Sequence, residues 1–159
     1  PEPTVENMAY FAVETAKMAR HMLGKSVRVA MLSASTSGSV PELAADRTRA
    51  AAALAKSMVQ KDCLNNEISI EGEIQIDAAL SSDSYSVRVH RNSMLQPSEV
   101  WVFPTLDAAD ISKRLWSMQP AVANYGLILG RVHDAVRIQL WPYSGRAALP
   151  DCPAAAADR

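Results

Sequence analysis

A hydroxyl-rich loop with one glycine is the part of this sequence best suited to binding an anion. Residues 33–39 read Ser-Ala-Ser-Thr-Ser-Gly-Ser and directly follow an apolar run, residues 27–32. A buried strand that leads into such a loop presents hydroxyl and backbone N–H groups at one edge of a sheet, where phosphate groups bind readily. We therefore expect a ligand-binding loop made by Ser33, Ser35, Thr36, Gly38 and Ser39.

A second polar segment, residues 71–80, combines carboxylates with an amide at every second position. It reads Glu-Gly-Glu-Ile-Gln-Ile-Asp-Ala-Ala-Leu and contains Glu71, Glu73, Gln75 and Asp77. Clustered carboxylates suit acid–base chemistry or a metal ion. Both uses remain open on this pattern alone.

The histidines and cysteines do not form a recognisable catalytic or metal-binding pattern. His21, His90 and His133 lack a serine or cysteine nucleophile at a motif distance. Cys63 and Cys152 have neither Cys-x-x-Cys spacing nor a histidine at metal-ligand spacing. We expect surface histidines, reduced thiols and no metal site.

The composition predicts one soluble globular domain. The chain has 159 residues, of which 48% are hydrophobic and 21% charged, and its formal net charge is -1. This balance gives no field that would attract nucleic acid or an anionic membrane, and no apolar run approaches the roughly 20 residues that cross a bilayer. The sequence opens with Pro rather than Met, which is compatible with upstream processing. The compartment is unassigned, and a mitochondrial or other organellar matrix is compatible with the Ala-rich composition.

The elements that position these motifs begin with a helix over residues 5–23. Thr4 is a suitable N-cap, apolar side chains recur every three or four residues, and Gly24 ends the helix. Next come a strand over residues 27–32, buried on both faces, and an Ala-rich helix over residues 42–61, with Pro41 at a first helical position.

The second part of the sequence continues the alternation of strands and helices. Residues 81–96 predict either a strand or a loop, because Tyr85, Val87 and Val89 alternate with polar neighbours. The other expected elements are a strand over 68–70, a brief helix from Gln75 to Leu80, a strand over 100–103 stopped by Pro104, a helix capped by Asp107 and running to about Met118, and a last strand over 136–140.

This alternation predicts a three-layer α/β domain with a mostly parallel sheet. The domain is expected over residues 1–142. A Pro/Ala-rich tail, residues 143–159, is expected to be extended or disordered.

The two polar motifs together resemble the phosphate acetyltransferase and butyryltransferase family, in which they read roughly VAMLSxSTKGS and DGExQxDAA. The resemblance spans about residues 4–140, mainly the later half of a catalytic unit about twice this length. It implies the three-layer fold of isocitrate/isopropylmalate dehydrogenase-like proteins and transfer of an acyl group between phosphate and the thiol of coenzyme A. It also implies that Glu73, Gln75 and Asp77 frame the site rather than react.

The sequence departs from the family pattern where the family holds its anionic substrate. Ser37 replaces a lysine. A Pro-Asp-Leu-Asn-x-Gly-Asn element becomes Pro-Thr-Leu-Asp-Ala-Ala-Asp, which changes Thr105, Asp107, Ala109 and Asp110. A carboxylate about 4 Å from a phosphate oxygen costs roughly 4 kcal/mol at an effective dielectric constant of about 20. The two aspartates therefore oppose phosphate binding at a helix start that otherwise favours it.

A third departure follows the last expected strand. Many family members carry an Arg-Gly element there, whereas this chain has Leu-Trp-Pro at residues 140–142. Arg137 and Arg146 are the available replacements. Arg137 belongs to the expected strand and Arg146 to the tail.

Our first hypothesis from these losses is a non-catalytic phosphate acyltransferase-like protein that acts as a structural or interaction subunit of a larger assembly. Its partner would be a second copy, a chain that carries the front half of the fold, or an unrelated complex. The alternative is an active phosphate acetyltransferase, or a fragment of a larger acyltransferase or malic enzyme fusion. A third, weaker hypothesis is a sensor that keeps a coenzyme A or nucleotide pocket. No cofactor is expected, and coenzyme A binds only if an alternative holds.

Overall fold

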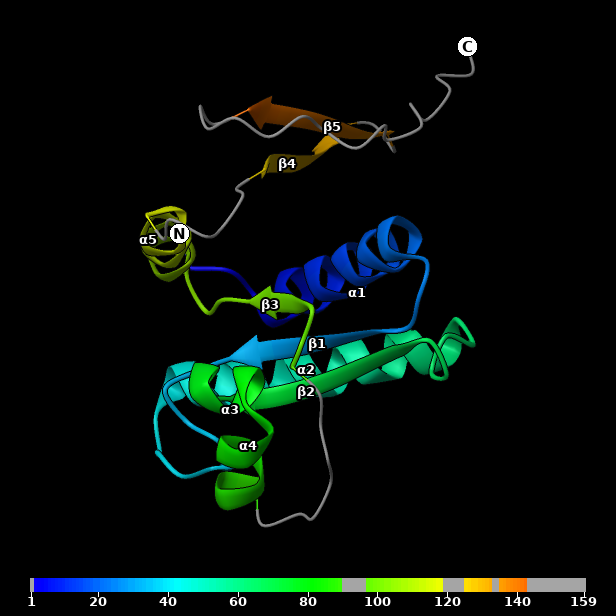
Figure 1. Cartoon of the computed structure of the whole chain (residues 1–159). Helices are drawn as coiled ribbons and strands as arrows, with labels where there is room; N and C mark the ends of the chain where they lie inside the picture. The colour runs from blue at the N-terminus through cyan, green and yellow to red at the C-terminus, as the bar shows by residue number, and fades with distance from the viewer. Residues whose placement is uncertain (1, 90–96, 119–124, 133–134, 143–159) are drawn as a thin grey trace. The chain divides into compact units, whose positions relative to one another are not determined.

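The computed structural model describes residues 2–89, 97–118, 125–132 and 135–142 (Figure 1). It divides into two compact units, Pro1–Ile111 and Ser112–Arg159. The elements, in chain order, are α1 (Val5–Leu23), β1 (Val27–Leu32), α2 (Leu43–Lys61), β2 (Ile68–Ile74), α3 (Ile76–Leu80), α4 (Ser82–Val89), β3 (Val100–Val102), α5 (Leu106–Ser117), β4 (Tyr125–Val132) and β5 (Ala135–Pro142). The predicted tail, residues 143–159, lies outside the described residues.

The first unit is built on a parallel three-stranded sheet in the order β2-β1-β3. Along β1 the side chains alternate between two apolar clusters. Val27, Val29 and Met31 pack with α1 and α2, whereas Ala30 and Leu32 pack with α3 and α4. Because β1 is central and covered on both faces, its sequence is continuously apolar apart from Arg28. The predicted three-layer α/β fold is confirmed.

Helices α1 and α2 pack against each other and against the sheet through small side chains. Alanine leaves room for two helix backbones and a sheet to approach closely, and it is the best helix former. The fully or almost fully buried alanines of these two helices are Ala9, Ala12, Ala16, Ala45, Ala51, Ala52 and Ala55.

Helix ends match the prediction for α1 and differ for α2. The Thr4 hydroxyl accepts a hydrogen bond from the Asn7 N–H at 3.2 Å, and Gly24 takes the left-handed conformation with φ 62°. Helix α2 begins at Leu43, not at Pro41, because its first backbone hydrogen bond runs from the Asp46 N–H to the Glu42 carbonyl.

The segment after α3 is helical, so the prediction of a strand or loop is wrong for residues 82–89. Helix α4 begins after Ser81, whose carbonyl accepts a hydrogen bond from the Tyr85 N–H at 3.0 Å. Tyr85 is buried in the cluster with α3, while the Val87 side chain is 71% exposed. The alternation of apolar residues that suggested a strand therefore does not mark a common buried face. Residues 90–96 lie outside the described residues.

The second unit contains a two-stranded antiparallel sheet made by β4 and β5. The predicted last strand is present and longer, since β5 covers residues 135–142. The analysis of the sequence did not identify β4, which pairs with β5 from Tyr125–Pro142 to Val132–Ala135. Only two residues separate these strands in the sequence, a spacing that is typical of antiparallel pairing. No helix within the described ranges combines the length and the apolar content that crossing a bilayer requires.

An irregularity in β2 sets the direction of the segment that carries the carboxylates. Met31 pairs with Gly72 and Leu32 pairs with Ile74, so Glu73 is left out of the ladder. Gly72 has φ 152°, and a Cβ at that position would lie 2.5 Å from Met31 Cβ and 2.9 Å from the Met31 carbonyl oxygen. Only glycine allows this close approach of the two backbones.

Replacing Gly72 tests how strongly the fold depends on this irregularity. We expect Gly72→Ala to lower the free energy of unfolding by about 3 kcal/mol, because strain in the backbone and a clash with Met31 add together. Gly24→Ala is the control: nothing lies within 4 Å of its Cβ position, so only the left-handed backbone costs about 1 kcal/mol. Urea denaturation of both variants measures the difference. Equal losses would contradict the assignment.

Candidate functional site

Three polar segments end up at one edge of the sheet. The loop of residues 33–39 follows β1, residues 73–77 contain the end of β2 and the start of α3, and residues 104–110 follow β3. Because the three strands are parallel, their carboxyl ends meet at the same edge, which is where α/β proteins bind ligands. The structure thus brings together the segments that the sequence analysis selected.

Glu73 is the centre of this edge. Its side chain is 1% exposed and accepts hydrogen bonds from the loop and from α2. Oε1 accepts from the Gly38 N–H at 2.6 Å, from the Ser35 hydroxyl at 3.0 Å and from Arg49 Nη2 at 3.0 Å. Oε2 accepts from Arg49 Nε at 2.8 Å. The carboxylate is therefore fully engaged inside the protein.

These contacts decide the charge state of Glu73. Burial by itself raises the pKa of a carboxyl group, but the hydrogen bonds from Arg49, the Gly38 N–H and Ser35 outweigh burial and lower the pKa of Glu73 from 4.5 to about 2. Glu73 is thus an anion throughout the neutral range. A permanently ionised carboxylate bound to arginine is a poor proton donor, so the contacts fit a framing role.

A second pair of hydrogen bonds joins the loop to the start of α3. The Thr36 hydroxyl accepts from the Gln75 backbone N–H at 2.9 Å and donates to Gln75 Oε1 at 3.2 Å. The Ser33 N–H donates to the Ile74 carbonyl at 3.0 Å. Together with the Glu73 contacts, these hydrogen bonds join two loop residues, Ser35 and Thr36, to two residues of the carboxylate segment, Glu73 and Gln75.

The backbone donors of the loop are used within the protein. All six N–H groups from Ser35 to Val40 donate to internal acceptors, which are the Ser33, Ser35 and Ser39 hydroxyls, the Thr36 and Glu73 carbonyls and the Glu73 carboxylate. In this conformation the Glu73 carboxylate occupies the Gly38 N–H that a bound anion would use. The loop is held in shape without a ligand.

Two of the predicted side chains are exposed rather than buried with Glu73. Ser37 is exposed and takes a left-handed conformation with φ 51°. Asp77 is exposed in the first turn of α3. Glu73 and Gln75 supply the side-chain contacts with the loop that are described above.

The third segment starts α5, and the predicted cap is wrong by two residues. The Thr105 hydroxyl accepts from the Ala108 N–H at 3.2 Å, and the Thr105 carbonyl accepts from the Ala109 N–H. Thr105 is therefore the cap, while Asp107 is exposed in the first turn and Asp110 is half-buried. A threonine hydroxyl satisfies the helix start as well as a carboxylate does, so propensity did not separate the two positions.

Two arginines on α2 were missed by the sequence analysis. Arg49 binds Glu73 and also donates from Nη1 to Asp46 at 2.7 Å. Arg47 forms an ion pair with Glu2 and donates from Nη2 to the Pro104 carbonyl at 3.4 Å. Residues two apart on a helix point in nearly opposite directions, so one arginine reaches the loop and the other reaches the end of β3. The Arg-x-Arg spacing near the start of an Ala-rich helix was the available signal.

Of the remaining candidates in the first unit, neither His21 nor Cys63 lies at this edge. His21 and Cys63 are exposed in the first unit, and His90, His133, Cys152 and Arg146 lie outside the described residues. Arg137 lies in β5. Among the residues that the structure describes, no group of three His, Cys, Asp or Glu side chains is placed to hold a metal ion.

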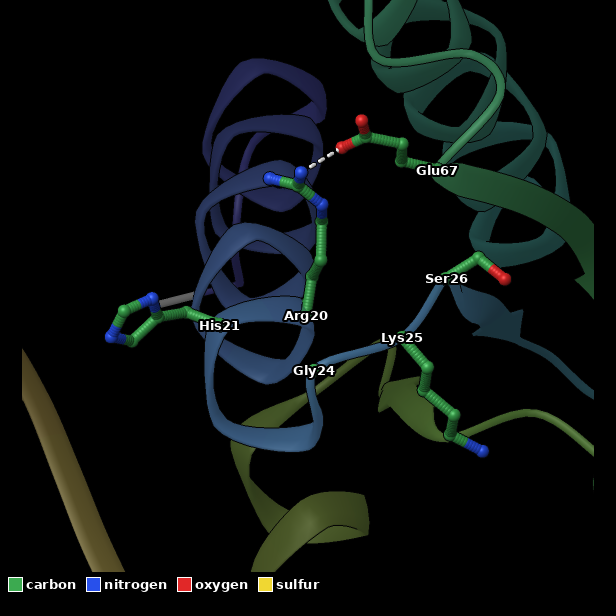
Figure 2. Close-up of a pocket in the computed structure, with 6 residues that line it drawn as sticks. All are labelled: Arg20, His21, Gly24, Lys25, Ser26 and Glu67. Carbon is green, nitrogen blue, oxygen red and sulfur yellow. Dashed lines mark ion pairs between the residues drawn. The ribbon is translucent and has the colours of Figure 1, made fainter.

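A pocket of about 400 Å³ lies at the opposite, amino-terminal edge of the sheet. Figure 2 shows its cations diverging: Arg20 is paired with Glu67, while the His21 and Lys25 side chains point away from each other. Lys25 Nζ is bound to Glu99 Oε1 at 3.0 Å. Because these positive groups are paired or do not converge, the pocket is a weaker candidate for anion binding.

Fold and site together define an α/β protein with a hydroxyl-rich loop at the carboxyl edge of a parallel sheet. The family model for phosphate acetyl/butaryl transferase matches residues 1–137. The chain belongs to this family.

Individual relatives agree with this assignment. A phosphate acetyltransferase from Thermoanaerobacterium thermosaccharolyticum is 35% identical over 115 residues, which are 72% of this chain and 33% of the relative. A phosphate acetyltransferase from Clostridium acetobutylicum is 31% identical over 115 residues, again 72% of this chain and 33% of the relative. The solved EutD phosphotransacetylase from Staphylococcus aureus superimposes with a TM-score of 0.66 at 32% identity and covers 72% of this chain and 34% of that chain. The chain thus spans about a third of the length of these relatives.

The lowered pKa of Glu73 predicts how stability depends on pH. A carboxylate whose pKa falls from 4.5 to about 2 on folding stabilises the protein above pH 4.5, and that stabilisation is lost as the pH falls from 4.5 towards 2. The shift corresponds to about 3 kcal/mol. We expect denaturant titrations across this range to show the loss, and Glu73→Gln to remove the part that Glu73 contributes, while Asp62 and Glu99, whose pKa values are also lowered, keep theirs.

The matched control for this measurement is Glu71→Gln, on the same strand and half-buried. It makes the same charge change without touching Arg49 or the loop. If Glu71→Gln and Glu73→Gln flatten the pH profile equally, the ion pair with Arg49 is not the source of the effect.

Proposed function

We propose that this chain forms part of a phosphate acetyltransferase, which transfers an acyl group between phosphate and the thiol of coenzyme A. One observation carries the proposal. The loop after β1 and the Glu73–Gln75 segment are separated by more than thirty residues, yet they form one hydrogen-bonded unit at the ligand-binding edge of the sheet. Membership of the family supports the same activity.

In this proposal the loop positions the phosphate or acyl phosphate, and the Glu73 network keeps the loop rigid. Preorganised donors around developing charge are a major source of rate enhancement in acyl transfer. Relatives named for this activity are about three times as long as the matched segment. The proposal therefore includes further polypeptide, in the same or another chain, that completes the site.

A second candidate is a non-catalytic subunit that keeps the fold and binds other protein chains. Two observations favour it: the loop N–H groups are occupied internally, and Asp107 adds negative charge in the first turn of α5. Leu43 and Leu106 are 88% and 80% exposed, and apolar side chains that follow two strands at the same edge suit contact with another chain. The partner would be a second copy or another subunit of an assembly.

Substrate turnover separates the two candidates. Protein purified from its native source, together with anything that copurifies, is assayed with acetyl phosphate and coenzyme A by the absorbance of the thioester. We expect thioester formation above the uncatalysed rate. No turnover, together with no heat of binding for either substrate, would leave the subunit role, which native mass spectrometry then tests by the mass of the assembly.

The carboxylates of α5 provide a second test of substrate binding at this edge. We expect Asp107→Asn to tighten phosphate binding by about tenfold, because it removes a negative charge from a helix start that otherwise attracts anions. Asp83→Asn, in the first turn of α4, is the charge-matched control and should leave the Kd unchanged. Calorimetric titration with inorganic phosphate measures both. Equal Kd values for all three proteins would argue against a phosphate at the start of α5.

A further inference from the structure

Arg49 lies against the loop at the point where the sequence lacks the family's cation. A Cβ at Gly38 would lie 3.7 Å from Arg49 Nη2. Gly38 is the neighbour of Ser37, the position at which the family has lysine. The guanidinium thus brings oriented N–H donors to the loop from a different element, helix α2.

The orientation of Arg49 is fixed while part of it remains available. A guanidinium has five N–H donors, and Arg49 uses three of them: Nε and Nη2 on Glu73 and Nη1 on Asp46. One donor on each terminal nitrogen has no partner among the described residues, and the side chain is 45% exposed. A planar, immobilised guanidinium with two spare N–H groups matches the oxygens of a phosphate.

The internal use of the loop's N–H groups makes this cation necessary. With the donors from Ser35 to Val40 already satisfied, an anion at the loop needs donors from elsewhere. The carboxylates of Glu73 and Asp46 offset the charge on Arg49, so the guanidinium offers fixed N–H donors, and the same two contacts prevent the side chain from moving away. Binding to a fixed arginine costs less conformational entropy than binding to a mobile lysine.

We propose that Arg49 contacts the phosphoryl group of the ligand and takes over the role of the lysine that the family has at position 37. This inference rests on the proposed function and adds a binding residue to the site. Glu73 acts as a positioning residue in it, because it holds the guanidinium and does not itself touch the ligand.

Titration of the chain with inorganic phosphate, followed by calorimetry and by amide NMR shifts, tests the proposal. We expect wild-type binding to shift the amide signals of Gly38 and Ser39. Arg49→Gln should raise the Kd about ten- to a hundredfold, the range for one lost charge-assisted pair of hydrogen bonds. The Kd of Arg49→Lys should lie between those of wild type and Arg49→Gln, since lysine restores the charge but not the paired N–H groups of the guanidinium.

Two control variants separate binding from stability. Arg20→Gln removes the same charge and one ion pair at the opposite edge of the sheet and should leave the Kd unchanged. Val59→Ala, at a 3% exposed position ten residues further along α2, should lower the melting temperature without changing the Kd. Each variant is compared at a temperature at which circular dichroism shows it to be folded.

The outcomes distinguish this inference from the function on which it rests. If Arg49→Gln binds phosphate as tightly as wild type, Arg49 is only a structural partner of Glu73, and the proposed function stands without it. If the wild-type chain and the native preparation bind neither phosphate, acetyl phosphate nor coenzyme A, both proposals fail.

Discussion

The carboxyl edge of the sheet depends on one ion pair between a buried carboxylate and a partly exposed guanidinium. Glu73 and Arg49 meet between β2 and α2, and the same carboxylate accepts hydrogen bonds from the loop after β1. A buried carboxylate is tolerated only when it is paired and fully hydrogen-bonded, so the positions of the loop, the helix and the strand are mutually constrained. Gly72 permits the register shift between β1 and β2. Because this shift leaves Glu73 out of the strand pairing, the Glu73 side chain can point towards the loop.

This arrangement explains how the family fold persists although its polar elements have changed. The hydroxyls and carboxylate that shape the loop are retained, and they satisfy one another without a ligand. The changed positions, Ser37, Asp107 and Asp110, are exposed or half-buried and contribute little to the core. The fold therefore tolerates changes at these positions.

Most of the fold was predictable from the sequence because local signals and burial agree. Thr4 and Gly24 delimit α1, and the continuous apolar run of β1 requires cover on both faces. Residues 82–89 were misassigned because Tyr85 is buried by tertiary contacts that no local pattern reveals. The site was predictable only in part. The loop of residues 33–39 and the polar segment of residues 71–80 were evident from the sequence. The pairing of Arg49 with Glu73 was not, because it joins residues 24 positions apart and depends on how α2 packs on the sheet.

The alanine-lined contact between α1 and α2 has a consequence for how this protein tolerates sequence drift. Positions such as Ala12 and Ala52 have almost no side chain to lose and no free volume in which to gain one. Substitutions in this layer are therefore limited to small residues, with glycine or serine accepted far more readily than any larger residue. Exposed polar positions, such as Ser37, are free of this limit, so they can change while the helix pair stays nearly fixed in composition.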